Sequence, residues 1–277
     1  MTVVHVEPSS PEGQGVLARL RGTGRALTVA GAFDEMAVWT AAARAAGFVR
    51  VLAAPGPAGL TGEEVAALKA AGLDGLRVRL YAAEAAAHDW HAGREGSFRA
   101  TTATLRAART ARVPVTVTTP LTRSNTRVLA AVPGLVADVG ALGWQVSVVA
   151  EGRPQEHGAV APRLAVAVPY ALQALVAAER AGLLAALAGA PLCLLGPLRD
   201  RALPSPTLAF AESCRECGLR ASCPGVDAEY LRRLGAGELA PARPGEASAA
   251  GGPRAQRLRD MFSGPWLEVS EAACWPI

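Results

Sequence analysis

Short apolar runs rich in valine and leucine alternate with longer amphipathic stretches over the first 150 residues. The short runs are typical of buried strands, and the longer stretches, with apolar residues three or four apart, are typical of helices. Strands that alternate with helices of this length indicate βαβ crossovers and a parallel sheet. The expected strands are Thr2–Val6, Ala26–Val29, Phe48–Ala53, Leu76–Tyr81, Val113–Thr118 and Trp144–Val149, and the expected helices are Gly13–Leu20, Asp34–Ala46, Thr61–Ala71, Ser97–Ala111 and Asn125–Ala137.

Capping residues predict where several of these helices begin. Thr61 and Glu64 have the spacing of a capping box, and Asp34 and Ser97 are expected to be the N-caps of two other helices. A long loop is expected between the fourth strand and Gly96. Six βα units can form a partial barrel or an open doubly wound sheet, and periodicity alone does not separate the two.

The second half of the chain is less regular. Residues 151–162 are polar and irregular, and a helix is expected over Tyr170–Ala181. Gly235–Gln256 is a Gly/Ala/Pro-rich linker, and the tail beyond it carries Trp266 and Cys274 and is expected to dock on the rest of the protein. The chain is thus divided into a barrel (1–182), a four-cysteine segment (183–240), and a linker with a docking tail (241–277).

Composition and charge exclude several classes of protein. The chain of 277 residues is 51% hydrophobic, which is enough for a core, and its net charge is only +4. Its arginines are scattered, whereas nucleic-acid binders show a basic stripe with aromatic platforms, so no nucleic-acid partner is expected. No signal peptide is apparent, and the longest uncharged stretch, Ala181–Leu198, is broken by glycine and proline. We therefore expect a cytoplasmic protein without a membrane span.

The cysteines are the strongest chemical signal. None precedes Cys193, and Cys214, Cys217 and Cys223 then follow with the spacing x20, x2 and x5. In a reducing compartment such a cluster indicates metal binding rather than disulfides, and four thiolates suit a tetrahedral zinc site or an iron–sulfur cluster. A zinc ribbon would offer two CxxC knuckles where this chain has one, which favours iron–sulfur and leaves zinc as the alternative. Cys274 is expected to be a docked apolar residue, although it could replace one ligand.

A second candidate site follows the fourth strand, at the end of a barrel where such folds place their chemistry. His88, Asp89 and His91 could serve acid–base or metal chemistry there, with Ser97 close by. The other interpretation is structural: Asp89 caps a turn, the histidines are solvated, and Ser97 begins the next helix.

Three segments, in this order, resemble radical SAM enzymes with SPASM or twitch extensions. They are HDWHAGREGSF (88–98), TVTTPLTRSN (116–125), and PLCLL (191–195) followed by CRECGLRASCPGVDAEYLRRLG (214–235). The resemblance covers about residues 20 to 240. It implies an α/β fold with a partial (β/α)6 TIM-like barrel. It also implies an auxiliary 4Fe–4S cluster held by the four cysteines, with a substrate loop near Ser97.

The chain departs from this family at its defining motif. The family holds its SAM-cleaving cluster in a CxxxCxxC loop after the first strand, and residues 6–13 contain no cysteine. The family's GGEP motif appears here as Ala30-Gly31-Ala32-Phe33, without the carboxylate. Neither S-adenosylmethionine binding nor radical chemistry is expected from this chain alone.

These observations predict a degenerate radical-SAM-like accessory protein that keeps its auxiliary cluster and binds a peptide or a partner enzyme in a maturation pathway. Two alternatives remain open. One is a non-radical enzyme that uses His88, Asp89 and His91 at the barrel mouth, and the other is a structural zinc protein with four cysteine ligands.

Overall fold

One parallel sheet runs through the computed structural model, which describes residues 2–3, 6–148, 160–203, 208–243, 252–262, 264 and 266–269. Its strand order is β1-β9-β2-β3-β4-β5-β6-β7-β8, and every pairing between neighbouring strands is parallel. The strands are β1 Thr2–Val3, β2 Ala26–Gly31, β3 Arg50–Pro55, β4 Gly75–Arg79, β5 Val115–Pro120, β6 Gly143–Ser147, β7 Leu184–Ala188, β8 Ala202–Leu203 and β9 Trp266–Glu268.

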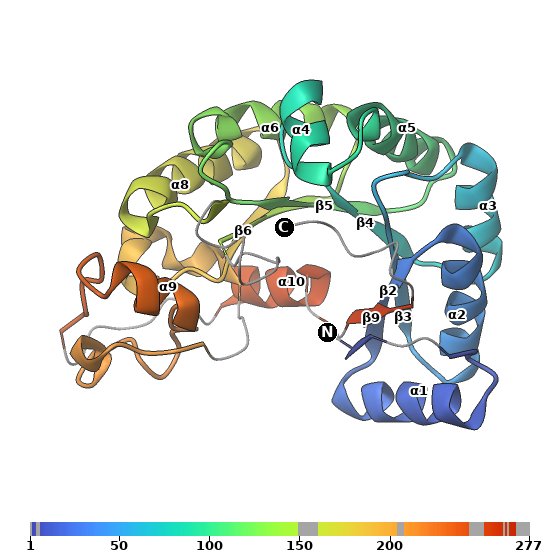
Figure 1. Ribbon diagram of the computed structural model, residues 1–277, viewed down its shortest axis with the longest axis horizontal. Helices are drawn as coiled ribbons and strands as arrows, with labels where there is room; N and C mark the ends of the chain where they lie inside the picture. The colour runs from blue at the N-terminus through green and yellow to red at the C-terminus, as the bar shows by residue number, and fades with distance from the viewer. Residues whose placement is uncertain are drawn as a thin grey trace.

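The sheet curls into an open half-barrel with helices along its convex side (Figure 1). This α/β architecture confirms the predicted partial TIM-like barrel. The α-helices are α1 Pro11–Thr23, α2 Phe33–Ala45, α3 Gly62–Ala70, α4 Ala85–Ala92, α5 Ser97–Thr110, α6 Val132–Asp138, α8 Leu164–Arg180, α9 Ala228–Leu234 and α10 Pro253–Phe262. The 3-10 helices are η1 Thr126–Ala131, η2 Leu192–Leu194, η3 Gly196–Arg201 and η4 Glu212–Cys214.

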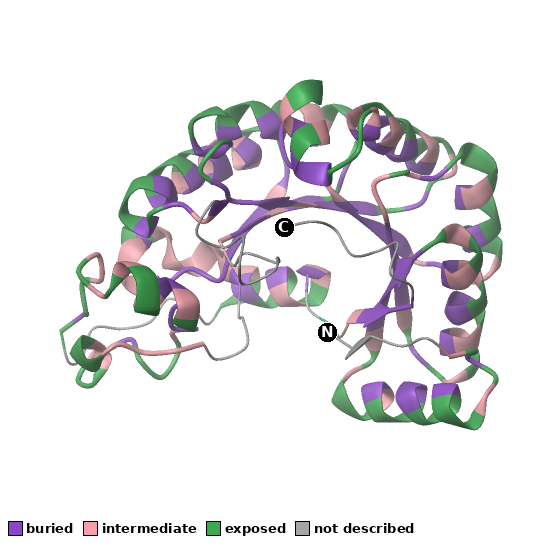
Figure 2. Cartoon of the chain, in the orientation of Figure 1, coloured by how far each residue is buried: buried purple, intermediate pink, exposed green. Residues whose placement is uncertain are grey.

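The main core lies between the sheet and the outer helices, as the buried strands and exposed outer helix surfaces of Figure 2 show. Successive strand residues point to opposite faces of the sheet. In β4, Leu76 and Val78 belong to this core, while Arg77 between them faces the concave side, where its guanidinium lies 5.8 Å from the Trp266 ring centre. Burial lowers the pKa of Arg77 to about 10, so this side chain keeps its charge at neutral pH.

Several expected elements need correction. Six strands, β2 to β7, lie side by side in the sheet in the order in which they occur in the chain. They differ from the six expected strands at both ends, because β9 separates β1 from β2 and because β7 was not expected. The sheet therefore continues past residue 182, where the barrel was expected to end. Residues 85–92 form helix α4 in place of a loop, because AAAHDWHA consists mostly of helix-compatible residues and ends at Gly93 in the left-handed conformation (φ 63°).

The predicted helix starts were right in one case out of three. The capping box is confirmed, with the Glu64 amide donating to Thr61 Oγ1 at 3.2 Å and the Thr61 amide to Glu64 Oε2 at 2.7 Å. Asp34 lies inside the first turn of α2 rather than at its N-cap, and Ser97 lies inside α5, whose N-cap is Gly96. At α5 the Asp89 carboxylate, which accepts the Phe98 amide at 2.6 Å, takes the place of an N-cap side chain.

The C-terminal part of the chain docks on the barrel, as expected for the tail that carries Trp266. Strand β9 inserts between β1 and β2, and α10 lies on the concave side (Figure 1). The last turn of α10 packs at Gly143, where an added Cβ would overlap Met261 and stand 2.8 Å from the Leu184 carbonyl. Arg77 donates to the Met261 carbonyl at 3.4 Å. Cys274 lies outside the described residues.

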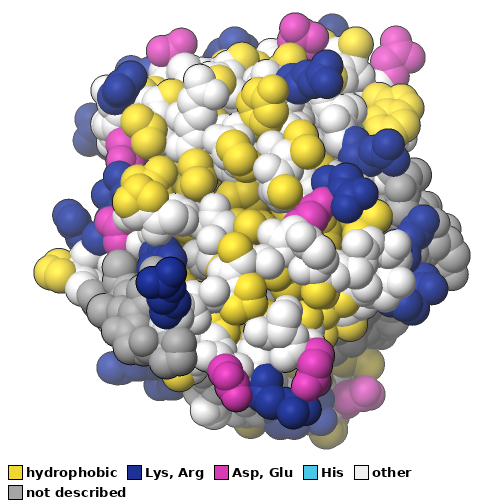
Figure 3. All heavy atoms as spheres, turned by 90° about the vertical axis from the view of Figure 1, so that its left-hand side faces the viewer, with side chains coloured by type: hydrophobic (Ala, Val, Ile, Leu, Met, Phe, Trp, Pro, Cys, Tyr) yellow, Lys and Arg dark blue, Asp and Glu magenta, His cyan; other side chains and the backbone are white. Residues whose placement is uncertain are grey.

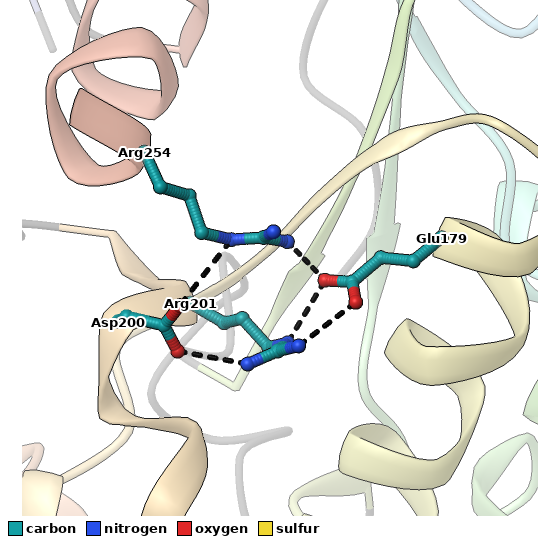
Figure 4. Close-up of polar contacts among 4 residues, drawn as sticks. All are labelled: Glu179, Asp200, Arg201 and Arg254. Carbon is teal, nitrogen blue, oxygen red and sulfur yellow. Dashed lines mark hydrogen bonds and ion pairs between the residues drawn. The ribbon is translucent and has the colours of Figure 1, made fainter.

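Four charged side chains attach the start of α10 to α8 and η3 (Figure 4). Glu179 of α8 accepts two hydrogen bonds from Arg201, each at 2.8 Å, and a further one from Arg254 of α10. Asp200 bonds Arg201 at 2.8 Å and lies 3.7 Å from Arg254. Because one carboxylate bridges two partly buried arginines, these bonds should contribute more than a surface ion pair.

Glu179→Ala is therefore expected to lower the free energy of unfolding by about 2 kcal/mol, since it leaves two partly buried arginines without their main acceptor. Urea unfolding measures the loss, and hydrogen exchange should show faster exchange in α10. Glu212→Ala is the matched control, because its partner Arg215 is 75% exposed, and less than about 0.5 kcal/mol is expected there. Equal losses in the two variants would contradict this role of Glu179.

One face of the surface is drawn in Figure 3. On the face that Figure 3 shows, basic side chains are dispersed around the edge of the view and hydrophobic ones gather toward its centre. Among the described residues, no helix is long and apolar enough to cross a membrane.

Candidate functional site

The cysteine-bearing segment, residues 208–243, is a loop-rich unit with η4 and α9 as its helices. Ala209 and Val226 close its base with two backbone hydrogen bonds of 2.9 Å. Gly225 has φ 84°, and a Cβ there would stand 2.5 Å from the Ala209 carbonyl, so this turn needs glycine. The chain thereby turns back directly after Cys223.

Tyr230 and Glu238 attach this segment to the barrel at the N-terminus of α8. The Leu164 amide donates to the Tyr230 hydroxyl at 2.9 Å, and the Ala165 amide donates to Glu238 at 3.1 Å. The Tyr230 hydroxyl in turn donates to Glu238, which also pairs with Arg163. These contacts satisfy helix amides that lack a local cap and place a carboxylate at the positive end of α8.

Burial, and then the bond to Glu238, raise the pKa of Tyr230 to about 12, so its hydroxyl remains a donor at neutral pH. The contacts of Tyr230 and Glu238 with the start of α8 join residues 66 to 75 positions apart, so the sequence carries no local signal for them.

The four predicted ligand cysteines line one pocket. Cys193 comes from η2, Cys214 from the end of η4, and Cys217 and Cys223 from the loop that follows. All four are free thiols of intermediate burial. The rest of the lining is mainly apolar and comprises Pro191, Ala209, Phe210, Leu219, Arg220, Gly225, Val226, Leu239 and Pro241. The structure thus brings together four side chains that the sequence spreads over 31 residues.

Backbone amides point at the sulfurs in this pocket. Such N–H groups stabilise thiolate sulfur and are a feature of metal-bound cysteines. The bonds run to Cys223 from Leu192 and Gly225, both at 3.4 Å, and to Cys217 from Ala242 at 3.3 Å.

Cys193 shows how the four thiols affect one another. Burial raises the pKa of its thiol, the Ala240 backbone lowers it, and the other three cysteines raise it further. Several thiolates in one apolar pocket therefore repel one another, and a cationic centre between them would remove that cost.

A single metal ion needs several ligand side chains within reach of one point. Among the described residues, no three His, Cys, Asp or Glu side chains stand where they could together hold one metal ion. Tetrahedral zinc would require sulfurs about 3.8 Å apart.

The histidine candidates have a different environment from the one expected. His88 is fully buried and its Nδ1 accepts the Tyr81 amide at 3.2 Å, while its Nε2 bonds Ser97 Oγ at 3.2 Å. Burial lowers the pKa of His88 to about 4, so the ring is neutral and both nitrogens are used. Ser97 is also fully buried, which leaves it as a partner of His88 rather than an accessible group.

His91 and Asp89 belong to the same helix as His88, α4, and their side chains bond residues outside it. His91 is 2% exposed, so neither histidine is solvated, and burial lowers its pKa. Its Nε2 lies 2.6 Å from the hydroxyl of Ser124. Asp89 accepts the amides of Gly96 and Phe98 at 2.7 and 2.6 Å, and thus caps the turn before α5 as the structural interpretation expected. Both of its oxygens are engaged by backbone.

Sequence reasoning missed Asn125, which connects this region to the barrel. Its side chain donates to the carbonyls of Tyr81 and Pro120 at 2.9 and 2.7 Å and accepts the Thr122 amide at 2.8 Å. An asparagine at the expected start of a helix was the only signal, and it does not distinguish a cap from a bridge between strands.

No protein-family model matches the chain, and no curated protein matches it. One similar solved structure is a domain of pyruvate-formate lyase-activating enzyme from Bacteroides vulgatus, with 12% identity and a TM-score of 0.46, covering 58% of this chain and 96% of that one. Another is the HMG-CoA lyase from Brucella melitensis, with 15% identity and a TM-score of 0.42, covering 73% and 72%. Likenesses of this degree assign the chain to no family and to no activity.

Proposed function

We propose that this chain is an iron–sulfur protein built on a radical-SAM-like half-barrel, which holds an auxiliary 4Fe–4S cluster and does not cleave S-adenosylmethionine. The observation that carries the proposal is the pocket lined by Cys193, Cys214, Cys217 and Cys223, with backbone amides donating to Cys217 and Cys223. When bound, such a cluster supplies one-electron transfer or structural support.

The cysteine pattern of the sequence supports a cluster over zinc. A cubane of four iron atoms would hold its cysteine sulfurs about 6 Å apart, which is wider than the separation around a single zinc ion. The sequence has one CxxC knuckle, where a zinc ribbon would have two. The amide donors fit either metal, so they support the site without selecting its occupant.

The topology supports the absence of a SAM-cleaving cluster. The loop that would hold a SAM-cleaving cluster follows the first strand of the family. If β1 is taken as that strand, the corresponding loop is residues 6–13, and if β2 is taken, the loop begins at Ala32. Neither loop contains a thiol, because no cysteine precedes Cys193. The insertion of β9 between β1 and β2 in the sheet adds no thiol to either loop.

We infer an accessory role because the chain has the proposed site for an auxiliary cluster but lacks the cysteines that would hold a SAM-cleaving cluster. We place the chain beside a peptide or a partner enzyme in a maturation pathway, which rests on the three sequence segments that resemble SPASM and twitch proteins. A catalytic role for His88, Asp89 and His91 is less well supported, because His88 uses both nitrogens and Asp89 both oxygens in bonds that hold the fold.

Iron, zinc and acid-labile sulfide should be measured on protein purified without oxygen. About four iron and four sulfide per chain, with a brown colour, are expected. One zinc without sulfide would overturn the cluster in favour of the structural zinc alternative. Titration of the same preparation with S-adenosylmethionine in a calorimeter is expected to show no binding, and a saturable heat signal would contradict the lost activity.

A further inference from the structure

Arg220 and Phe210 lie together at the four-cysteine pocket. The Arg220 guanidinium carbon stands 4.4 Å from the Phe210 ring centre, and its Nη1 donates to the Cys214 carbonyl at 3.2 Å. Both side chains belong to the lining of the pocket, in which Arg220 is the single charged residue. Arg220 is exposed, so it forms part of the outer wall rather than the floor.

The loop between Cys217 and Cys223 determines where Arg220 stands. It is the middle residue of the five-residue spacer, its amide donates to the Cys217 carbonyl at 3.0 Å, and the Cys223 amide donates to the Leu219 carbonyl at 2.9 Å. These two bonds form consecutive tight turns, so the backbone at Arg220 is set by the same loop that presents two cysteines.

From this geometry we propose that Arg220, stacked on Phe210, covers the mouth of the cysteine pocket and limits the access of water and small solutes to the group held there. The inference rests on the proposed function, because it assigns a regulator of access to the same site. Arg220 is a positioning residue here, not a ligand.

Arginine suits this position for two reasons. Its guanidinium is planar and weakly hydrated, so it can lie on an aromatic ring while its edge donates to a carbonyl. The inner wall is already closed by apolar side chains such as Leu219 and Val226, which are 1% and 3% exposed. Solvent access to the cysteines, which are of intermediate burial, is then controlled at the outer wall.

Release of iron to a chelator under argon tests the cover directly. Arg220→Ala and Phe210→Ala are each expected to release iron at least about fivefold faster than the unmodified chain, with equal iron and sulfide at the start. Arg220→Lys should be intermediate, because lysine keeps the charge but cannot stack and bond in one plane. Arg215→Ala is the matched control, since Arg215 is 75% exposed and pairs with Glu212.

Release from Arg220→Ala and Phe210→Ala at the rate of the Arg215→Ala control would overturn the cover. If Phe210→Ala does not fold, Phe210→Leu removes the stacked ring while filling the space, and the same acceleration is expected.

Failure of the proposed function appears separately, as an unmodified chain without iron and sulfide. The cover is then measured by alkylation of the metal-free thiols with iodoacetamide, where Arg220→Ala should again react several times faster than Arg215→Ala. Equal alkylation rates would overturn the cover in that case too.

Discussion

Replacing Cys217 by alanine is expected to abolish metal binding and to unfold much of residues 208–243. Cys217 is one of the four cysteines that line the pocket, and its sulfur accepts a hydrogen bond from the Ala242 amide. Its loss therefore removes one ligand and one hydrogen bond to the end of the segment. Metal binding at such sites is folding free energy, on the order of 10 kcal/mol for structural zinc in small domains. The segment has little regular secondary structure, and its remaining support comes from Leu219, Val226 and Tyr230, which pack in the main core.

Three measurements follow the effect of Cys217→Ala. Iron and sulfide per chain should fall to less than about a tenth of the unmodified content. Hydrogen exchange should increase throughout residues 208–243 while β2 to β6 remain protected, because those strands are buried between the concave side and the outer helices. The melting temperature should decrease as well.

Two matched variants make this result specific. Ser222→Ala changes a neighbouring residue of the same loop, whose hydroxyl donates only to the Leu219 carbonyl at 3.2 Å, and should retain the metal. Cys274→Ala removes a thiol outside the proposed ligand set and should also retain it. Metal lost from Cys274→Ala, or unchanged content and melting temperature in Cys217→Ala, would show that the ligand set is wrong.

Acidification is expected to destabilise the protein through His88. Burial lowers the pKa of this ring from 6.5 to about 4 in the folded chain. The unfolded chain therefore binds the extra proton first, and stability is lost as the pH falls from about 6.5 toward 4. From pH 7 to pH 5 this group alone should cost about 2 kcal/mol, and the lowered pKa of His91 acts in the same direction.

Urea unfolding of the unmodified chain and of His88→Gln, at pH 8, 7 and 5, measures this contribution. His88→Gln will be less stable at every pH, so the quantity to compare is the change with pH. Both proteins should change little between pH 8 and 7, and only the unmodified chain should lose the full amount between pH 7 and 5. A pH dependence that is the same in both would contradict the assignment to His88.

The sequence by itself determined the elements whose signals are local. The capping box at Thr61 lies within four residues, and strands β2 to β6 are recognisable because their apolar residues are contiguous in the chain. The spacing of Cys214, Cys217 and Cys223 likewise indicated one site, since short loops keep their ends together. The tertiary structure adds that Cys193, separated from the next cysteine by twenty residues, lines the same pocket.

Tertiary structure alone decided the features that depend on distant partners. Arg50 donates to the Asp260 carbonyl across 210 residues, and β9 pairs with β2 across more than 230 positions. The three residues of β9 are too few to carry a local pattern. The environment of His88 was also decided there. Its sequence neighbours allow a solvated loop or a buried helix. Its partners Tyr81 and Ser97 are only seven and nine residues away in the chain, but the packing of α4 against α5 decides that the ring is buried among them. Burial and long-range pairing depend on the whole fold, so no window of the sequence contains them.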